Sequence, residues 1–70
     1  MRYIIAGSMR EASALAQRLA LDEWQHINNV RDLRMAKSVL LGKGYENRHD
    51  WATLYDYMLS KNISMKVDHS

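Results

Sequence analysis

Two largely apolar runs and two alternating segments predict four β-strands in this chain. The runs Tyr3–Ala6 and Ser38–Gly42 carry consecutive apolar residues, which indicates strands covered by helices on both faces. The segment Trp24–Ile27 alternates only loosely, and Ile63–Val67 alternates apolar with polar positions, so both are expected at sheet edges. The first run, Tyr3–Ala6, is therefore expected in the middle of the sheet.

Helical periodicity predicts three helices between these strands. A helix over Met9–Ala20 places small and aliphatic side chains on one stripe, and a short helix is predicted over Val30–Ala36. The strongest periodicity lies over Arg48–Ser60. Its apolar residues recur at i, i+3, i+4, i+7 and i+8, namely at Trp51, Leu54, Tyr55, Met58 and Leu59. Tyr57 falls outside this stripe and is expected to be exposed.

A polar residue followed three positions later by an acid precedes each predicted helix. These pairs are Ser8 with Glu11, Asn29 with Asp32, and Asn47 with Asp50. The polar side chain accepts a backbone N–H of the first turn, and the acid favours the positive end of the helix. Only the Ser8 pair has the Ser-x-x-Glu sequence of a capping box, and Asn62 is predicted to end the third helix in a left-handed conformation.

The alternation of strands and helices predicts one α/β domain over residues 1–70. Right-handed crossovers lead to a minimal four-stranded parallel sheet in the order 2-1-3-4 with three helices, a Rossmann-like or flavodoxin-like half. The first helix then covers one face of the sheet and the other two cover the opposite face. The polar side of the last strand is expected where no helix shields it.

Composition narrows the classes of function. The 70 residues include no Cys, which excludes disulfides and thiolate metal sites, and their formal net charge is only +2. Because the charges are interspersed, they favour neither nucleic acid nor an anionic membrane as a partner. No apolar stretch approaches the roughly 20 residues that span a bilayer, and the N-terminal run is too short for a signal peptide. We therefore expect a cytoplasmic protein.

The carboxyl ends of the first and third strands are the predicted ligand site, because open α/β sheets bind ligands where the winding reverses. Two loops lie there, at residues 7–10 and 42–49. Both begin with a glycine that permits close backbone approach, and cationic side chains add contacts to an anion. The candidate ligand-binding residues are Gly7, Ser8, Arg10, Gly42, Lys43, Gly44, Tyr45 and Arg48. They favour a nucleotide or phosphate ligand, with the tyrosine stacking on a ring.

A structural interpretation of these loops remains open. The glycines then only turn the chain, and neither G-x-G-x-x-G nor G-x-x-x-x-G-K-[ST] is present. Ser8 is better explained as a helix cap than as a nucleophile. His26, His49 and His69 lie on different elements, so the sequence predicts no metal site. We accordingly expect no catalytic residue and no cofactor.

Three stretches carry a resemblance to a known class of proteins. The opening Arg-Tyr-Ile-Ile-Ala-Gly-Ser, the middle Val-Leu-Leu-Gly and the segment Asp-Trp-Ala-Thr-Leu-Tyr-Asp-Tyr-Met-Leu-Ser resemble small orphan proteins encoded by bacteriophages. The opening is also similar to nucleotide-sensing Rossmannoid domains that begin strand-Gly-Ser-Arg, although Met9 stands where that pattern has Arg. The phage resemblance implies an accessory protein in the host cytoplasm that acts by binding.

Two function classes follow from these observations. The first is a non-enzymatic protein that binds itself, as a homodimer, or a host protein. Its candidate interface residues are Tyr57, Ser64, Lys66 and Asp68. The second is a nucleotide or phosphate binder that uses the two glycine loops. An unequal number of helices on the two faces and exposed sheet edges favour self-association.

Overall fold

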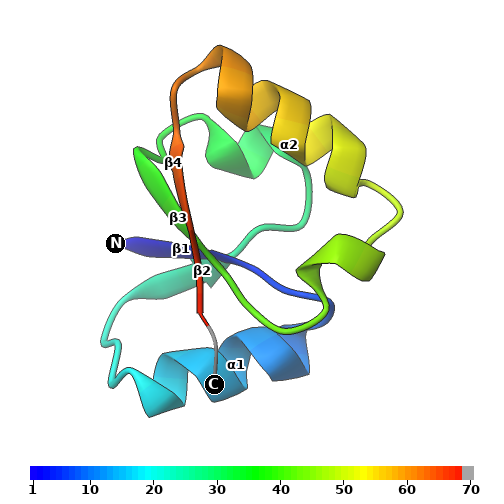
Figure 1. The fold of residues 1–70 in the computed structure, drawn as a ribbon. Coiled ribbons are helices and arrows are strands. Elements are labelled where there is room, and N and C mark those ends of the chain that lie inside the picture. Colours follow the sequence, from blue (N-terminus) through cyan, green and yellow to red (C-terminus); the bar gives the residue numbers. More distant parts are fainter. Residues whose placement is uncertain (69–70) are drawn as a thin grey trace.

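The computed structural model describes residues 1–68, in which strands alternate with helical elements (Figure 1). The strands are β1 (Arg2–Ile5), β2 (Trp24–His26), β3 (Ser38–Leu41) and β4 (Ser64–Val67). The helices are α1 (Met9–Arg18) and α2 (Trp51–Ser60), and two 3-10 turns, η1 (Val30–Leu33) and η2 (Tyr45–Asn47), complete the elements. His69 and Ser70 lie outside the described residues. Neither α-helix is long and apolar enough to cross a membrane.

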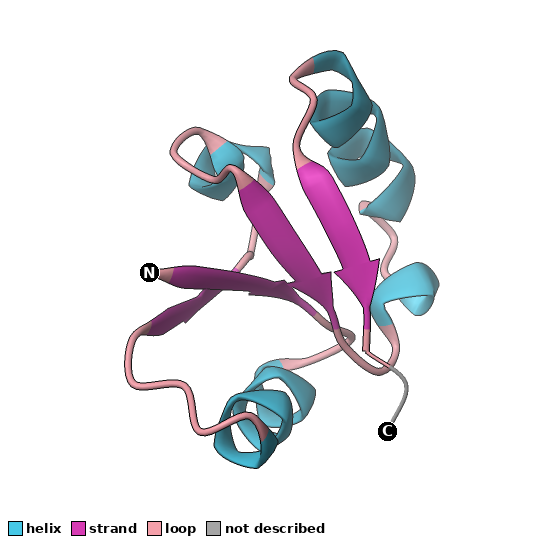
Figure 2. Ribbon diagram, turned by 60° about the vertical axis from the view of Figure 1, so that its left-hand side comes forward, coloured by secondary structure: helices cyan, strands magenta, loops and turns pink. Residues whose placement is uncertain are grey.

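All four strands belong to one parallel sheet in the order β2-β1-β3-β4, which confirms the predicted strand order (Figure 2). In the register of the two central strands Ile4 lies beside Leu40, and in that of β3 and β4 Leu40 lies beside Lys66. The order places the carboxyl ends of β1 and β3 next to each other. It leaves β2 and β4 as the two edges.

Two apolar layers enclose the sheet, because successive strand residues point to opposite faces. The α1 side is built on Ile4 and Leu40, and the opposite side on Ile5 and Leu41. The α1-side layer consists of Ile4, Ala6, Ala12, Leu15, Ala16 and Leu40. The other layer, which we call the α2-side core, contains Ile5, Ile27, Leu33, Ala36, Val39, Leu41, Leu54, Met58 and Ile63. Figure 1 shows α1 on one side of the sheet and α2 with η1 on the other, as predicted.

The structure contains two α-helices rather than the three that were predicted, because the segment Val30–Ala36 forms only the single 3-10 turn η1. A reciprocal capping box forms at this turn and not at Ser8, where it was predicted and where only the bond from the Glu11 N–H to Ser8 Oγ is present. The Oδ1 atom of Asn29 accepts from the Arg31 N–H at 3.0 Å, and Asp32 Oδ2 accepts from the N–H of Asn29 at 3.3 Å. A reciprocally capped turn satisfies its own first N–H groups without further helix. The chain can therefore enter β3 a few residues later.

The helix predicted over Arg48–Ser60 begins later, at Trp51, and presents a different face. Asn47 ends η2, and Asp50 occupies the N-cap position of α2 without a side-chain bond to it. Leu54 and Met58 are fully buried, but Tyr55 and Leu59 are 40% and 53% exposed. The helix packs against η1, which draws the Tyr57 flank inward and leaves the Tyr55 flank in solvent.

Both α-helices end with a residue in the left-handed region. The φ of Asn62 is +57°, which confirms the predicted cap, and the φ of Ala20 is +54°. The Leu21 N–H donates to Ala16 O at 2.9 Å, and the Ile63 N–H donates to Met58 O at 2.9 Å. These are the bonds of the Schellman motif, which satisfies the last helical carbonyls.

Candidate functional site

The two predicted loops meet at the carboxyl ends of β1 and β3. The Gly7 N–H donates to Lys43 O at 2.9 Å. A Cβ atom on Gly7 would lie 3.0 Å from Gly44 O and 3.1 Å from Gly44 Cα, and Gly44 itself has a φ of +83°. These glycines therefore allow one backbone to pack directly on the other. This contact supports the structural interpretation of the two glycine loops.

The third glycine is required by packing on α1. A Cβ atom on Gly42 would lie 3.2 Å from Ala6 Cβ and 3.2 Å from Leu15 Cδ2. Ser8 begins the same helix, since its Oγ accepts the Glu11 N–H at 3.3 Å. This bond confirms Ser8 as the N-cap of α1.

A hollow of ≈ 340 Å³ lies between η1 and the C-terminal part of α2, and a larger one of ≈ 470 Å³ lies elsewhere on the surface. The larger one is at the carboxyl ends of β3 and β4, and it is lined by Leu41, Gly42, Lys43, Gly44, Tyr45, Glu46, Val67 and Asp68. It combines one cation, Lys43, with the carboxylates of Glu46 and Asp68. This balance of charge opposes an anionic ligand. Arg10 is exposed and does not line the hollow.

Tyr45 packs against an aromatic neighbour. Its ring lies edge-on to Trp51, with centroids 4.9 Å apart and planes at 73°, and both rings are half-buried against the α2-side core. Edge-to-face pairs of this kind contribute about 0.5–1.5 kcal/mol beyond the area they bury. The aromatic contact thus connects η2 to the first residue of α2.

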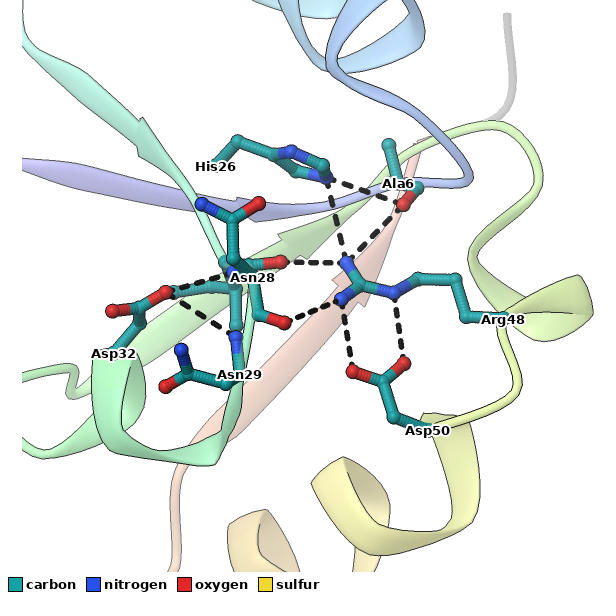
Figure 3. Close-up of polar contacts among 8 residues, drawn as sticks. Ala6, His26, Asn28, Asn29, Asp32, Arg48 and Asp50 are labelled. Carbon is teal, nitrogen blue, oxygen red and sulfur yellow. Dashed lines mark hydrogen bonds and ion pairs between the residues drawn. The ribbon is translucent and has the colours of Figure 1, made fainter.

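The Arg48 side chain lies at the carboxyl ends of β1 and β2, where it is hydrogen-bonded to other parts of the chain (Figure 3). Its side chain is only 12% exposed. Nε and Nη2 donate to the two carboxylate oxygens of Asp50 at 2.9 and 3.0 Å. Nη1 donates to Ile27 O at 2.6 Å and Ala6 O at 3.3 Å, and Nη2 also donates to Asn28 O at 3.3 Å. All five N–H groups of the guanidinium therefore have acceptors within the chain.

His26 completes this polar cluster. Its Nε2 lies 3.2 Å from Ala6 O and 3.4 Å from Arg48 Nη1, while Nδ1 is buried without a hydrogen-bond partner. Within residues 1–68, no three His, Cys, Asp or Glu side chains are placed to hold a metal ion. The cluster joins the ends of β1 and β2 to the segment that leads into α2.

Sequence reasoning did not find this cluster, and the available signal was weak. The pattern Arg48-x-Asp50 before a helix permits a bidentate ion pair. The other acceptors are backbone carbonyls, which any residue type supplies. From the sequence we expected an accessible Arg48 that binds phosphate. The contacts of its guanidinium do not support that role.

The outer edge of β4 presents unpaired backbone groups. The N–H groups of Ser64 and Asp68 donate to Lys37 O and Leu41 O of the neighbouring strand, each at 3.1 Å. Because alternate residues of a strand bond to the same neighbour, Met65 and Val67 direct their N–H and C=O groups away from β3. No described strand lies on that side of β4.

Two of the four predicted interface residues, both on β4, are exposed to solvent. Ser64 and Lys66 are exposed, and Val67 is 38% exposed. Asp68 forms an ion pair with Arg18 of α1, which locates Asp68 on the α1 side of the sheet.

The remaining predicted interface residue, Tyr57, lies on α2 rather than on the edge strand. It is half-buried against the α2-side core, contrary to the exposure that was predicted, and Lys61 Nζ lies 6.0 Å from its ring centroid. Tyr57 and Lys61 line the smaller hollow together with Leu33 of η1 and residues that follow this turn.

Comparison with known proteins shows no matching family model, no similar curated protein and no similar solved structure.

Proposed function

We propose that this protein is a non-enzymatic binding protein whose β4 edge takes up an extended strand from another polypeptide. The observation that carries the proposal is the outward direction of the Met65 and Val67 backbone groups. An exposed sheet edge binds a partner strand through main-chain hydrogen bonds, and neighbouring side chains then select the partner.

Of the two edges, β4 is the better suited to this role. It has four residues, three of them exposed, whereas β2 has three residues that are half-buried or buried. The polar clusters at Asn29 and Arg48 also occupy the end of β2. A strand added beside β4 meets exposed side chains, whereas a strand added beside β2 meets half-buried or buried ones.

The partner that we propose is a second copy of the chain or a host protein, as the resemblance to small bacteriophage proteins implies. The contact between Gly7 and Gly44 and the saturation of Arg48 support this interpretation over ligand binding at the glycine loops. Catalysis has no support in these contacts, since the Ser8 hydroxyl caps α1.

The proposal is tested by replacing a single outward N–H. Val67→Pro removes that donor without removing a bond to β3, so the sheet should stay folded. Wild-type protein and Val67→Thr, which keeps both the N–H and the side-chain shape, serve as the controls. We expect wild-type and Val67→Thr to capture the same polypeptides from a host lysate and Val67→Pro, with an unchanged melting temperature, to capture none of them. Equal capture by all three proteins contradicts the proposal.

The alternative is a nucleotide or phosphate ligand in the hollow beside β3 and β4, where Lys43 and Tyr45 both line the wall. Titration with nucleotides and inorganic phosphate tests it through the backbone amides of Lys43, Gly44 and Tyr45. Saturable shifts of these amides that Lys43→Ala abolishes support the ligand. Unmoved amides exclude it.

A further inference from the structure

We propose that the strand that binds at β4 is β4 of a second copy, antiparallel to the first, with the two-fold axis passing through Val67. This inference rests on the function proposed above, because it specifies the partner of the same edge. The result is a continuous eight-stranded sheet across two protomers.

Backbone geometry limits the possible centres of such a pair. Residues that exchange both hydrogen bonds across an antiparallel pair must both point outward, which in β4 applies to Met65 and Val67. The axis can therefore pass through either residue, or through Lys66 between them. These three registers differ in which side chains become neighbours.

Charge and hydrogen bonding separate the three registers. An axis through Lys66 places its ammonium group directly opposite that of the partner's Lys66, which is unfavourable. An axis through Met65 extends the pairing to Ile63, whose N–H already donates to Met58 O at 2.9 Å. An axis through Val67 avoids both problems, because it pairs the outward N–H of Val67 with the C=O of the partner's Val67.

The register through Val67 also brings opposite charges together. Lys66 then lies opposite the partner's Asp68, and by symmetry the same pair forms a second time. Lys66 and Asp68 are two residues apart in the strand, so both lie on the α1 side of the sheet. The ion pair with Arg18 holds Asp68 on that side, where 24% of its side chain remains exposed for a second cation.

The absence of Cys from the chain makes the register directly measurable by disulfide formation. Single-cysteine variants Met65→Cys, Lys66→Cys and Val67→Cys can form only intermolecular bonds. At a two-fold centre of this kind the Cα atoms lie about 5.5 Å apart, within disulfide range. Cysteines at Lys66 become diagonal neighbours about 7–8 Å apart, beyond that range. We expect Val67→Cys to cross-link at least tenfold faster than the other two.

Sedimentation over a concentration series gives the second readout. Lys66→Glu should weaken the dimer about tenfold, because two attractive cross-strand pairs become repulsive. Arg31→Glu, the same change of charge at an exposed position in η1, is the control and should leave the dimer unchanged. Fastest cross-linking at Met65 or Lys66, or equal effects of the two charge reversals, overturns the register.

A wild-type chain that sediments only as an 8.2 kDa monomer up to millimolar concentration overturns self-pairing altogether. That result is distinguishable from failure of the proposed function. If Val67→Pro still abolishes capture of a different polypeptide, the β4 edge binds strands but not its own copy. If Val67→Pro changes neither capture nor sedimentation, the binding edge itself is wrong.

Discussion

The Nη1 atom of Arg48 lies 2.6 Å from the carbonyl oxygen of Ile27, across 21 residues of sequence. Ile27 directly follows β2, and Arg48 lies three residues before α2. This bond and its neighbours fasten the entry to α2 onto the ends of two strands. The carboxyl ends of β1 and β2 are therefore held to the start of α2 by hydrogen bonds within the chain.

Removing the guanidinium should cost much of the stability of the domain. Arg48→Ala leaves Ile27 O and the Asp50 carboxylate without their donors, so we expect a loss of about 2–4 kcal/mol in the free energy of unfolding. Arg48→Lys should recover only part of it, because one ammonium group cannot replace a planar fork of donors. Urea denaturation provides the measurement, with the exposed Lys43→Ala expected within about 0.5 kcal/mol of wild type. Equal stability of Arg48→Ala and Lys43→Ala would show that the cluster does not form.

The close contact between the two glycine loops predicts that a side chain at Gly44 lowers the stability of the fold. Gly44→Ala combines a φ of +83° with a contact of 3.1 Å to Gly7 Cα. We expect it to destabilise the fold by about 1–3 kcal/mol. Thermal denaturation measures this effect. If the glycines served only to admit a ligand, Gly44→Ala would keep its melting temperature and lose only ligand binding.

The end of α1 offers a stabilising change. Ala20 has a φ of +54°, which is unfavourable for a residue with a Cβ atom. We expect Ala20→Gly to raise the free energy of unfolding by about 0.5–1 kcal/mol, since relief of this strain exceeds the entropy that glycine adds to the unfolded chain. Ala14→Gly, at an exposed position inside α1, is the opposite control and should lower stability. Both changes are measurable by urea denaturation.

Two leucines of α2 test the face that the helix presents. Leu54 is fully buried and Leu59 is 53% exposed, although the sequence placed them on the same stripe. Leu54→Ala should destabilise the protein by about 2–5 kcal/mol, whereas Leu59→Ala should stay within about 0.5 kcal/mol. If denaturant unfolding showed similar losses in the free energy of unfolding for both variants, the buried face would be the one that periodicity predicted.

The strand order was predictable because burial leaves a direct mark on sequence. The central strands β1 and β3 are covered on both faces, so they read as apolar runs, and the edge β4 alternates. The rotation of α2 was not predictable in the same way. The residues Trp51–Ser60 are apolar on more than one flank, and contact with η1 decides which flank is buried.

The features of the candidate site were also only partly predictable from the sequence. The meeting of the two glycine loops followed from the strand order, as did the exposure of Ser64 and Lys66. The role of Arg48 did not, because most of its acceptors are backbone carbonyls whose positions depend on the folded chain. A cationic side chain beside a glycine loop gives the same sequence pattern whether it binds a ligand or the protein's own backbone carbonyls.

Amide hydrogen exchange along β4 tests the central claim, uptake of a strand at this edge, most directly. The Lys66 N–H faces β3, whereas those of Met65 and Val67 face outward. In dilute protein we expect Lys66 to be protected and Met65 and Val67 to exchange rapidly. At high protein concentration exchange at Val67 should slow while Lys66 changes little, and a captured polypeptide that pairs along the whole of β4 should slow Met65 as well. Rapid exchange of both outward amides in every bound state would contradict the account.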